Sequence, residues 1–330
     1  MSPSRKSDRV DIVIVNFNGG SLLLRAVQAV MAQSFGNFRL IVVDNGSTDG
    51  SLENLPLDNP RLLVVRLERN TGFAAANNAA LNQWVTAPWT ALLNPDAFPD
   101  PGWLAALLSA AEDRPDCAFF GCRMRTEHDP RILDGVGDAY HPSGLYWREG
   151  HGCPGHGRFL ETREIFSPCA AAALYRTADL RAVGGFDEDF FCYGEDMDVG
   201  FRLRLAGRRG LYVPSATVSH MGSGVTGRDS DFALYHGHRN LVWNYVKNMP
   251  GPLLWLCLPG HLLLNLVTLA LFASRGRGHV AWQAKRDAVL GIPRMWRKRR
   301  AIHARRVVTL RALWRVMHHG IPSRRCPPDG

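Results

Sequence analysis

The feature that most constrains the fold is an alternation of short apolar segments and helical patterns along the first hundred residues. The apolar segments predict four strands, at Asp11–Asn16, Phe38–Asp44, Arg61–Arg66 and Trp89–Asn94. Helical periodicity lies between them, over Ser21–Gln33 with Ser21 as the N-cap, and over the small-residue segment Phe73–Gln83. Strands that are apolar almost throughout are buried on both faces. The pattern therefore predicts an α/β fold with a mostly parallel central sheet.

The rest of the chain extends this pattern and then departs from it. Further strands are predicted at Cys169–Tyr175 and Gly210–Val213, and a helix at Glu195–Ala206 that ends at Gly207. The segment Arg123–Glu164 is rich in glycine, histidine and charge, which predicts loops over the functional site. A length of 330 residues accommodates one large α/β domain of roughly 200–250 residues plus an addition.

Polar clusters follow three of the predicted strands, at the sheet edge where ligands of open α/β sheets bind. The clusters are Asn16-Phe17-Asn18, Asp44-Asn45-Gly46-Ser47 and Asn94-Pro95-Asp96. A carboxylate such as Asp44 can accept hydrogen bonds from a nucleobase or ribose, and the amides after it can face phosphate. The same string is also an ordinary Asx-type turn. Asp96, at the exit of a buried strand, is suited to hold a hard divalent cation through oxygen.

Two more segments carry candidate functional residues. The helix that begins after Asn70-Thr71-Gly72 has little side-chain bulk, so the sheet or a ligand can approach it closely. Tight packing accounts for its alanines but less readily for Asn70 and Asn78. The aromatic run Phe190–Tyr193 leads directly into Glu195-Asp196, which places a carboxylate beside an apolar wall. The helix dipole alone accounts for one or two acids at such a position, and a lone histidine such as His220 is more often structural.

Taken in order, these segments resemble the inverting glycosyltransferases of family 2. The resemblance rests on IVNFNG, VVDNGSTDGS, NTGFAAANN, LLNPDAFPD, GGFDEDFFCYGEDMDVGFR and VSHMG, and it extends from Asp11 to Asn248. Within the family, the chain is similar to bacterial rhamnosyltransferase-like enzymes that build surface polysaccharides. The resemblance implies the GT-A fold, in which one α/β domain binds a nucleotide sugar.

The resemblance also implies roles for particular residues. Asp44 is expected to bind the base or ribose of a UDP- or dTDP-linked donor, next to Asn16 and Phe17. Asn70, Gly72, Asn78 and Asn94 are expected to line the donor pocket. Asn94-Pro95-Asp96 takes the place of the family's D-x-D element, with Asn94 in the position of the first acid. Asp96 and His220 are then expected to hold Mg²⁺ or Mn²⁺ at the diphosphate.

The same resemblance assigns the chemistry. Asp196 is expected to act as the general base that takes the proton of the acceptor hydroxyl, with Glu195 as the neighbouring alternative. The metal would neutralise the departing nucleoside diphosphate. A single displacement inverts the anomeric configuration. Asp198 and Arg202, four residues apart, are expected to form a structural ion pair.

The C-terminal part of the chain points to a membrane. Residues 248–274 contain no charge, and the segment from Arg275 onward has 15 Lys and Arg against two acids. Basic clusters next to an apolar stretch are typical of contact with anionic lipid, whereas a nucleic-acid binder spreads its basic charge over a folded face. A solubilising or RNA-binding tail remains the alternative. We predict a catalytic domain over 1–247 and a membrane-association region over 248–330, without a nucleic-acid partner.

Pro252, Pro259 and Asn265 predict that the apolar stretch is broken. We therefore expect a helix pair that dips into the cytoplasmic leaflet of the plasma membrane, in a peripheral or monotopic protein, rather than one that spans it. The alternative is a soluble protein in which this apolar segment forms a helix packed on the core. The expected acceptor is a saccharide or a polyprenyl-linked saccharide. His303–Met317 adds an amphipathic helical pattern.

Cysteine usage and the N-terminus predict a cytosolic setting. The seven cysteines form no C-x-x-C pair and read as reduced core residues, and the N-terminal segment lacks the apolar core of a signal peptide. Two other function classes remain. A nucleotidyltransferase should have a basic residue beside Asn18-Gly19-Gly20, which has none. A catalytically degenerate nucleotide-sugar-binding protein should lack the candidate acids, which are present.

Overall fold

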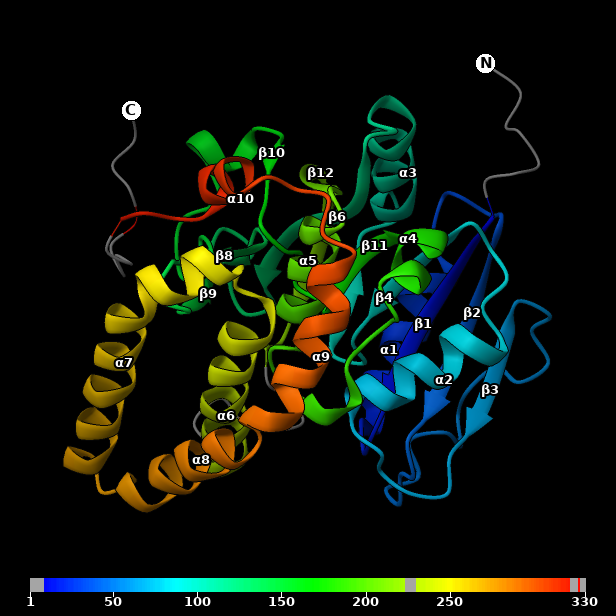
Figure 1. The fold of residues 1–330 in the computed structure, drawn as a ribbon. Helices are drawn as coiled ribbons and strands as arrows, with labels where there is room; N and C mark the ends of the chain where they lie inside the picture. Colours follow the sequence, from blue (N-terminus) through cyan, green and yellow to red (C-terminus); the bar gives the residue numbers. More distant parts are fainter. Residues whose placement is uncertain (1–8, 223–229, 321–325, 327–330) are drawn as a thin grey trace.

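The computed structural model describes residues 9–222, 230–320 and 326, and its centre is one large sheet (Figure 1). The N-terminal half of the sheet contains β1 (Val10–Asn16), β2 (Phe38–Asp44), β3 (Leu62–Arg66) and β4 (Trp89–Leu93), in the order β4-β1-β2-β3. These four strands are parallel, with Asn16 paired in register with Asp44. Their carboxyl ends therefore lie at the same edge. The strands predicted for this half are confirmed to within one residue.

The other half of the sheet is mixed. β11 (Ala172–Arg176) runs antiparallel to both β4 and β6 (Cys117–Thr126), while β12 (Arg209–His220) runs parallel to β6. The short strand β10 (Arg163–Glu164) forms the edge. Among the described residues, four of the nine strand pairings in this sheet are parallel and five are antiparallel. The parallel order predicted from the sequence is therefore confirmed for β4-β1-β2-β3, and the rest of the sheet is mixed. β12 extends well past the predicted Val213, and β5 (Ala97–Pro99) pairs with its far end.

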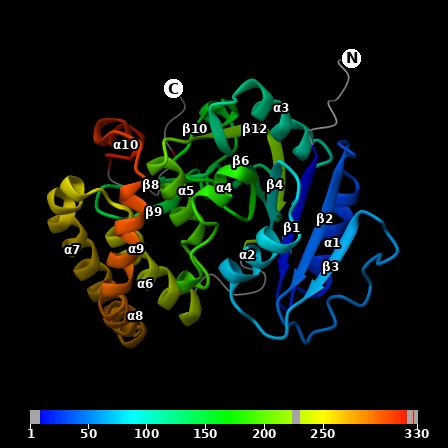
Figure 2. The same cartoon turned by 45° about the vertical axis from the view of Figure 1, so that its right-hand side comes forward.

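Helices cover both faces of the sheet (Figure 2). On one face, α1 (Gly20–Met31) and α3 (Trp103–Asp113) bury side chains such as Val27 and Trp103 in one core. On the other, α2 (Phe73–Gln83), α4 (Thr177–Ala182) and α5 (Glu195–Leu205) share a second core. The prediction that Ser21 caps α1 is wrong. The helix already begins at Gly20, so Ser21 lies inside its first turn.

The segment Arg123–Glu164 is less irregular than predicted. It continues β6, then forms β7 (Leu133–Gly135), the hairpin of β8 (Asp138–Tyr140) and β9 (Tyr146–Arg148), and the 3-10 helix η1 (Gly157–Leu160). Each strand after β6 has only two or three residues, too few for an apolar period to be visible in the sequence.

Five helices follow the sheet: α6 (Asp231–Asn248), α7 (Gly251–Ser274), α8 (Gly278–Leu290), α9 (Ile292–Ala304) and α10 (Leu310–Val316). They lie together on the side of the molecule away from β3 (Figure 1). α8 and α9 pack on α6, where Trp243 is buried with Ala288 and Met295. The core around α5, α6 and the first turn of α7 also includes Leu313 of α10. The C-terminal helices are therefore packed on α5 and on the part of the chain that contains the sheet.

Two helix predictions in this region are wrong. The apolar stretch is not broken into a pair, because α7 is one 24-residue helix with Pro259 inside it. Pro252 lies in the first turn, where no intrahelical donor is lost, and Pro259 removes a single hydrogen bond from a leucine-rich helix. His303–Met317 is not one helix, since the amides of Val307 and Val308 donate to the carbonyl of Leu205 at the end of α5. That contact interrupts the helical ladder between α9 and α10.

α7 is long and apolar enough to cross a membrane, and most of its apolar surface faces outward. Only 6% of its most apolar 18-residue window is buried inside the protein. Leu253, Leu254 and His261 face the core, whereas Trp255 and Leu256 are 63% and 70% exposed. This helix therefore packs along one side and leaves a large apolar face uncovered.

The cysteines are not all reduced core residues, which corrects the prediction. Cys117, Cys122 and Cys169 are free and buried, but Cys153 and Cys326 form a disulfide across 173 residues of sequence. The pairing depends on the return of the chain after α10 to the loop before η1. Sequence spacing carries no signal of that proximity.

Candidate functional site

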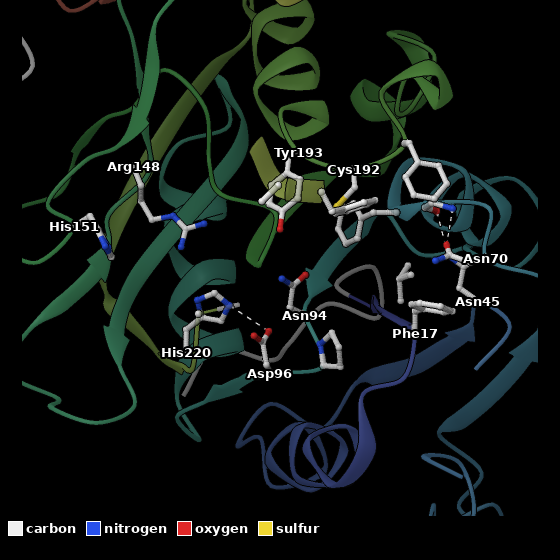
Figure 3. Close-up of a pocket in the computed structure, with 18 residues that line it drawn as sticks. Phe17, Asn45, Asn70, Asn94, Asp96, Arg148, His151, Cys192, Tyr193 and His220 are labelled. Carbon is white, nitrogen blue, oxygen red and sulfur yellow. Dashed lines mark hydrogen bonds and ion pairs between the residues drawn. The ribbon is translucent and has the colours of Figure 1, made fainter. Parts of the chain in front are cut away.

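A cavity of about 620 Å³ lies at the carboxyl ends of β1 and β4 (Figure 3). Six predicted site residues line it, namely Phe17, Asn70, Gly72, Asn94, Asp96 and His220. Asn45 of the polar cluster after β2 also lines the cavity, as do Phe191, Cys192 and Tyr193 of the predicted aromatic run. The lining further includes residues to which the sequence analysis gave no role: Phe73, Arg148, His151 and Phe232. Asn16, Asp44, Asn78, Glu195 and Asp196 are not among the lining residues. The site thus brings together most of the expected groups and adds a second set from the β8–β9 hairpin and α6.

Asn16 and Asp44 lie directly behind the cavity wall. Asn16 is fully buried, and its Nδ2 lies 3.1 Å from Asp44 Oδ1, 3.0 Å from Ser47 Oγ and 2.8 Å from Ser51 Oγ. One amide group thus ties the end of β1 to the turn after β2. Asp44 itself is 4% exposed. A donor contact by Asp44 stays a prediction, and the side chain that reaches the cavity from this turn is Asn45.

Asn45 and Asn70 form one polar corner of the cavity. Asn45 Nδ2 donates to Asn70 Oδ1 at 2.9 Å, and Asn45 Oδ1 accepts from the amide of Thr71 at 2.9 Å. Asn70 Oδ1 also accepts from the amide of Gly72 at 2.9 Å. These bonds fix both side-chain amides, so their orientation is set before any ligand arrives.

Gly72 permits a close approach of two segments. Its φ is +87°, and a Cβ atom there would lie 2.5 Å from the ring of Phe191. Phe191 and Tyr193 have φ of 65° and 67°, which is uncommon for aromatic residues and marks local strain. The strained segment turns the run Phe191–Tyr193 into the cavity, where Phe191 meets Phe232 edge-to-face with ring centroids 6.1 Å apart.

The structure corrects the place of Asn78. Its Nδ2 donates to the carbonyl of Phe186 at 2.8 Å and to Glu188 Oε1 at 2.9 Å, and its Oδ1 accepts from the amide of Phe186 at 2.8 Å. Asn78 therefore fastens the Gly184–Glu188 loop to α2 instead of lining the donor pocket. In the sequence, a polar residue in a small-residue helix is compatible with either position.

Asp96 and His220 meet at one side of the cavity because β5 pairs with the end of β12. His220 Nε2 lies 3.3 Å from Asp96 Oδ1, and His220 Nδ1 lies 2.7 Å from Asp134 Oδ2. Burial opposes the charged imidazole, but the hydrogen bonds to Asp134 and Asp96 outweigh it and raise the pKa of His220. Asp134, which the sequence did not single out, is fully buried.

This arrangement fits a divalent cation. A carboxylate oxygen and an imidazole nitrogen converge at the cavity wall, and they are suitable ligands for Mg²⁺ or Mn²⁺. Asp134 holds the opposite ring nitrogen of His220, as second carboxylates commonly do for metal-binding histidines. Asp96 and His220 would hold the ion, and Asp134 would orient the imidazole ring.

Asp196 lies in the first turn of α5. Its Oδ1 accepts from the amide of Met197 at 2.7 Å and its Oδ2 from the amide of Ala170 at 3.3 Å. Burial raises the pKa of Asp196, while those two amides and Arg148 act against the shift. The residue is nevertheless partly exposed, unlike Glu195. Burial, with the charge of Asp196 next, raises the pKa of Glu195 well above its usual range.

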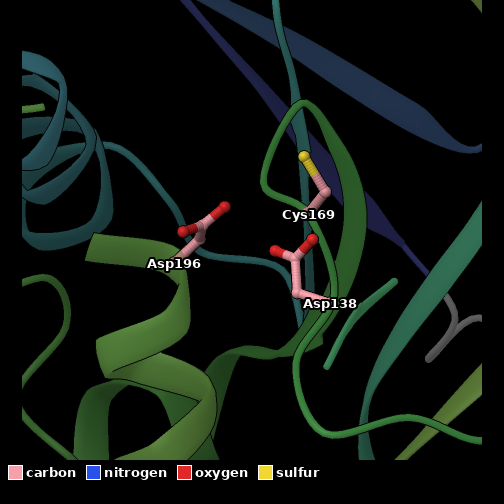
Figure 4. A group of neighbouring side chains, drawn as sticks. All are labelled: Asp138, Cys169 and Asp196. Carbon is pink, nitrogen blue, oxygen red and sulfur yellow. The ribbon is translucent and has the colours of Figure 1, made fainter. Parts of the chain in front are cut away.

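Asp196 belongs to a cluster with Asp138 and Cys169 (Figure 4). A carboxylate oxygen of each acid and Cys169 Sγ all lie within 4.8 Å of one another. Burial, followed by the charge of Asp196, raises the pKa of Asp138 well above its usual range. Of the two carboxyl groups, Asp138 is therefore the one more readily kept neutral.

Arg148 joins this cluster to the Asp134–His220 pair. It lies opposite Asp138 in the β8–β9 hairpin, and it donates from Nη1 to Asp134 Oδ2 at 2.5 Å and from Nη2 to Cys169 Sγ at 2.9 Å. Its stem crosses β7 at Gly135, where a Cβ atom would lie 2.2 Å from Arg148 Cγ. A guanidinium thus already supplies positive charge beside Asp138 and Asp196, which argues against a second cation there.

The predicted ion pair of Asp198 and Arg202 is present. Arg202 donates from Nε and Nη2 to Asp198 Oδ2 at 2.8 and 2.6 Å, and both side chains are buried. Lys247 Nζ of α6 also contacts Asp198, at 2.7 Å, and Asp187 at 2.5 Å. Lys298 of α9 binds Asp187 and, at 2.6 Å, Asp189. A charge network therefore links α5, α6 and α9 around the loop that leads to Asp196.

A mixed α/β sheet with a cavity at the carboxyl ends of its parallel strands is the architecture of the GT-A nucleotide-sugar transferases. Solved structures agree on the fold. GalNAc-T7 with UDP, GalNAc and Mn²⁺ aligns with a TM-score of 0.60 at 18% identity, over 74% of this chain and 48% of that one. The mannosyltransferase PcManGT from Pyrobaculum calidifontis, with GDP-Man and Mn²⁺, aligns at 0.55 and 18%, over 92% and 87%.

The chain belongs to glycosyl transferase family 2, whose family pattern matches residues 11–184. It is 29% identical, over 78% of its length and 94% of the relative's, to the N-acetylglucosaminyl-diphospho-decaprenol L-rhamnosyltransferase of Mycobacterium tuberculosis. It is 28% identical to the O-antigen biosynthesis protein RfbC of Myxococcus xanthus, over 66% of this chain and 18% of RfbC. The predicted family and fold are confirmed, and the chain is a glycosyltransferase.

Proposed function

We propose that the chain is a metal-dependent, inverting glycosyltransferase that moves a sugar, with rhamnose as the first candidate, from a UDP- or dTDP-linked donor to a polyprenyl-diphosphate-linked saccharide. The observation that carries this proposal is the one cavity that Asp96, His220 and Arg148 line together, with Arg148 close enough to Asp196 for its charge to act on that carboxyl group. The name of the mycobacterial relative supports rhamnose and a polyprenyl carrier. The UDP-, UDP-sugar- and GDP-Man-bound neighbours support a nucleotide donor.

The donor would bind across the strand ends. Asn45 and Asn70, fixed by their mutual hydrogen bond, would meet polar edges of the nucleoside, and Phe17 would pack against a flat apolar face. A Mg²⁺ or Mn²⁺ ion held by Asp96 and His220 would neutralise charge on the departing diphosphate. Phe191 and Phe232 would shield the opposite side of the cavity from water.

Asp196 would accept the proton of the acceptor hydroxyl as that oxygen attacks the anomeric carbon. The two amides that hold its carboxylate fix its direction, and burial makes it a stronger base than an ordinary aspartate. The same two amides and, after them, the positive charge of Arg148 act against the rise in the pKa of Asp196. Attack from the face opposite the leaving group, without a covalent intermediate, inverts the anomeric centre.

The acceptor's carrier lipid would bring the enzyme to the cytoplasmic face of the plasma membrane. The outer face of α7 presents Trp255, Leu256, Leu263 and Leu266, all more than half exposed, while His261 on its inner face stacks on Tyr245. A helix held by the protein along one side is suited to lie in the leaflet. On this proposal the protein is monotopic and residues 248–330 supply its membrane contact.

The metal assignment predicts that activity is lost in EDTA and returns with Mg²⁺ or Mn²⁺. Asp96→Ala should lower kcat/KM by about 100-fold or more, because the carboxylate ligand is removed. Release of nucleoside diphosphate, measured over a panel of UDP-, dTDP- and GDP-sugars with a polyprenyl-diphosphate-linked saccharide, is the assay. Asp58→Ala, at an exposed position in the loop before β3, is the matched control and should behave as wild type. If Asp96→Ala keeps full activity in the presence of the chelator, Asp96 and His220 do not bind a catalytic metal ion.

A further inference from the structure

A second cavity, of about 320 Å³, lies between the N-terminus of α7 and one side of α9. Its lining consists of Gly251, Trp296, Arg299, Arg300, His303 and Arg306. None of these residues lines the cavity of the transferase site. Three of the six are arginines and none is acidic, so the lining of the cavity carries positive charge.

α9 separates two kinds of basic residue. On one side, Arg294 Nε lies 3.0 Å from Asp189 Oδ2, and Lys298 binds Asp187 and Asp189. On the cavity side, Arg299, Arg300 and Arg306 have no carboxylate within 4.0 Å among residues 9–222, 230–320 and 326. The structure therefore neutralises one side of the helix internally and leaves the other side for a partner from outside.

Arg299 is the most constrained of the cavity residues. It is only 7% exposed, and its Nη1 donates to the carbonyls of Val246, at 2.9 Å, and Met249. Burial lowers the pKa of Arg299, and burial together with the charge of Arg299 lowers the pKa of His303 to about 4. A buried guanidinium without a carboxylate carries a desolvation cost that a bound anion would offset.

The surroundings of the cavity indicate what carries the anion. Gly251 begins α7 and lines the cavity, so the positive end of a 24-residue helix lies at this region. One turn further along α7, Trp255 and Leu256 begin the uncovered apolar face. A molecule with an anionic headgroup and an apolar tail could therefore place its headgroup in the cavity and its tail along the apolar face of α7.

We propose that this cavity binds the phosphate group of an anionic membrane lipid, with the lipid's chains along the exposed face of α7. The proposal rests on the membrane contact proposed above and adds a defined headgroup site to it. A general attraction between basic residues and an anionic surface does not depend on which arginines are present. Binding in the cavity does depend on which arginines are present, because only some of them line it. This difference allows a test.

The test compares two pairs of substitutions with the same change in charge in the full-length protein. Arg300→Gln with Arg306→Gln removes two cavity residues that are exposed and whose loss should leave the fold intact. Arg297→Gln with Arg305→Gln removes two exposed arginines that do not line the cavity. Binding is measured by flotation with vesicles of phosphatidylcholine alone or mixed with phosphatidylglycerol.

The cavity pair should lose at least tenfold more affinity for the phosphatidylglycerol vesicles than the control pair, with no difference between the pairs on phosphatidylcholine. Equal losses would overturn the proposal in favour of diffuse attraction. Displacement of the wild type from the vesicles by inorganic phosphate at the same concentration as the lipid phosphate would also overturn it, in favour of a free-phosphate site. Donor-dependent release of nucleoside diphosphate should stay unchanged in both pairs. If the wild type itself releases no nucleoside diphosphate from any donor, the proposed function is wrong, and the lipid-binding proposal for the cavity is still decided by the vesicle measurements.

Discussion

Asp196→Asn should lower kcat about 1,000-fold, within the range of 10²–10⁴ that general-base catalysis commonly contributes. The amide keeps the shape of the carboxylate but cannot accept the proton of the acceptor hydroxyl. Donor binding, measured by calorimetry with the nucleoside diphosphate, should be preserved because Asp196 is not among the residues that line the cavity. In the wild type, kcat/KM should fall as the pH drops through the pKa of Asp196, which burial raises above its ordinary value of 3.8. Below that pKa the base is protonated and inactive.

The neighbouring acid gives the matched control. Burial and the charge of Asp196 raise the pKa of Asp138 well above its usual range, so Asp138 is the more readily protonated of the two acids. Asp138→Asn keeps the shape of this carboxyl group. This variant should change kcat by less than about tenfold. If Asp138→Asn instead loses as much activity as Asp196→Asn, the two carboxyl groups act as one unit and the base cannot be assigned to Asp196 alone. Wild-type turnover in Asp196→Asn would move the base elsewhere, with Glu195 examined first.

Lys247→Met should destabilise the protein by about 3 kcal/mol, the lower end of the cost of breaking a buried ion pair. Its Nζ is buried between Asp187 and Asp198, and the substitution leaves both carboxylates with one positive neighbour fewer. Arg202 and Lys298 remain, which is why the lower end of the range applies. The measurement is the free energy of unfolding from urea titration in detergent.

Lys298→Met is the comparison for this prediction. Lys298 binds the same Asp187 but is partly exposed, so water screens the interaction and the loss should be no more than about 1 kcal/mol. Equal losses for the two lysines would mean that burial of the network is not what makes Lys247 important. A change in nucleoside diphosphate release without a change in stability would show that Lys247 acts on the reaction itself.

The N-terminal half of the fold could be predicted because each of its strands and helices has an apolar pattern within its own segment of sequence. Phe38–Asp44 and Phe73–Gln83 have the predicted bounds, since their apolar periods cover the whole element. The placement of Phe17, Asn70 and Asp96 at one cavity follows from parallel strands, whose carboxyl ends meet at one edge. For these residues, strand direction alone was enough.

The remaining site residues depend on long-range pairing that leaves no period in the sequence. Arg148 and Asp138 face each other in a hairpin of three-residue strands, and Asp134 reaches His220 only because β7 adds to β6. Asn78 shows the opposite failure. The neighbouring residues in the sequence made Asn78 a candidate for the donor pocket. Its side chain instead forms its hydrogen bonds with Phe186 and Glu188, in a loop more than a hundred residues away. Polar side chains in a sequence indicate that a partner exists without identifying it.

The contacts between α9 and the loop before α5 have a consequence for engineering. Arg294 and Lys298 bind Asp187 and Asp189, and Met295 covers Trp243, so residues after 248 form part of the surroundings of Asp196. A chimaera that joined residues 1–247 to another enzyme's C-terminal helices would replace Arg294, Met295 and Lys298 but keep their partners Asp187, Asp189 and Trp243. Such a graft would need compensating changes at Asp187, Asp189 and Trp243 to remain active. Membrane attachment and turnover are therefore expected to be inherited together, as one module.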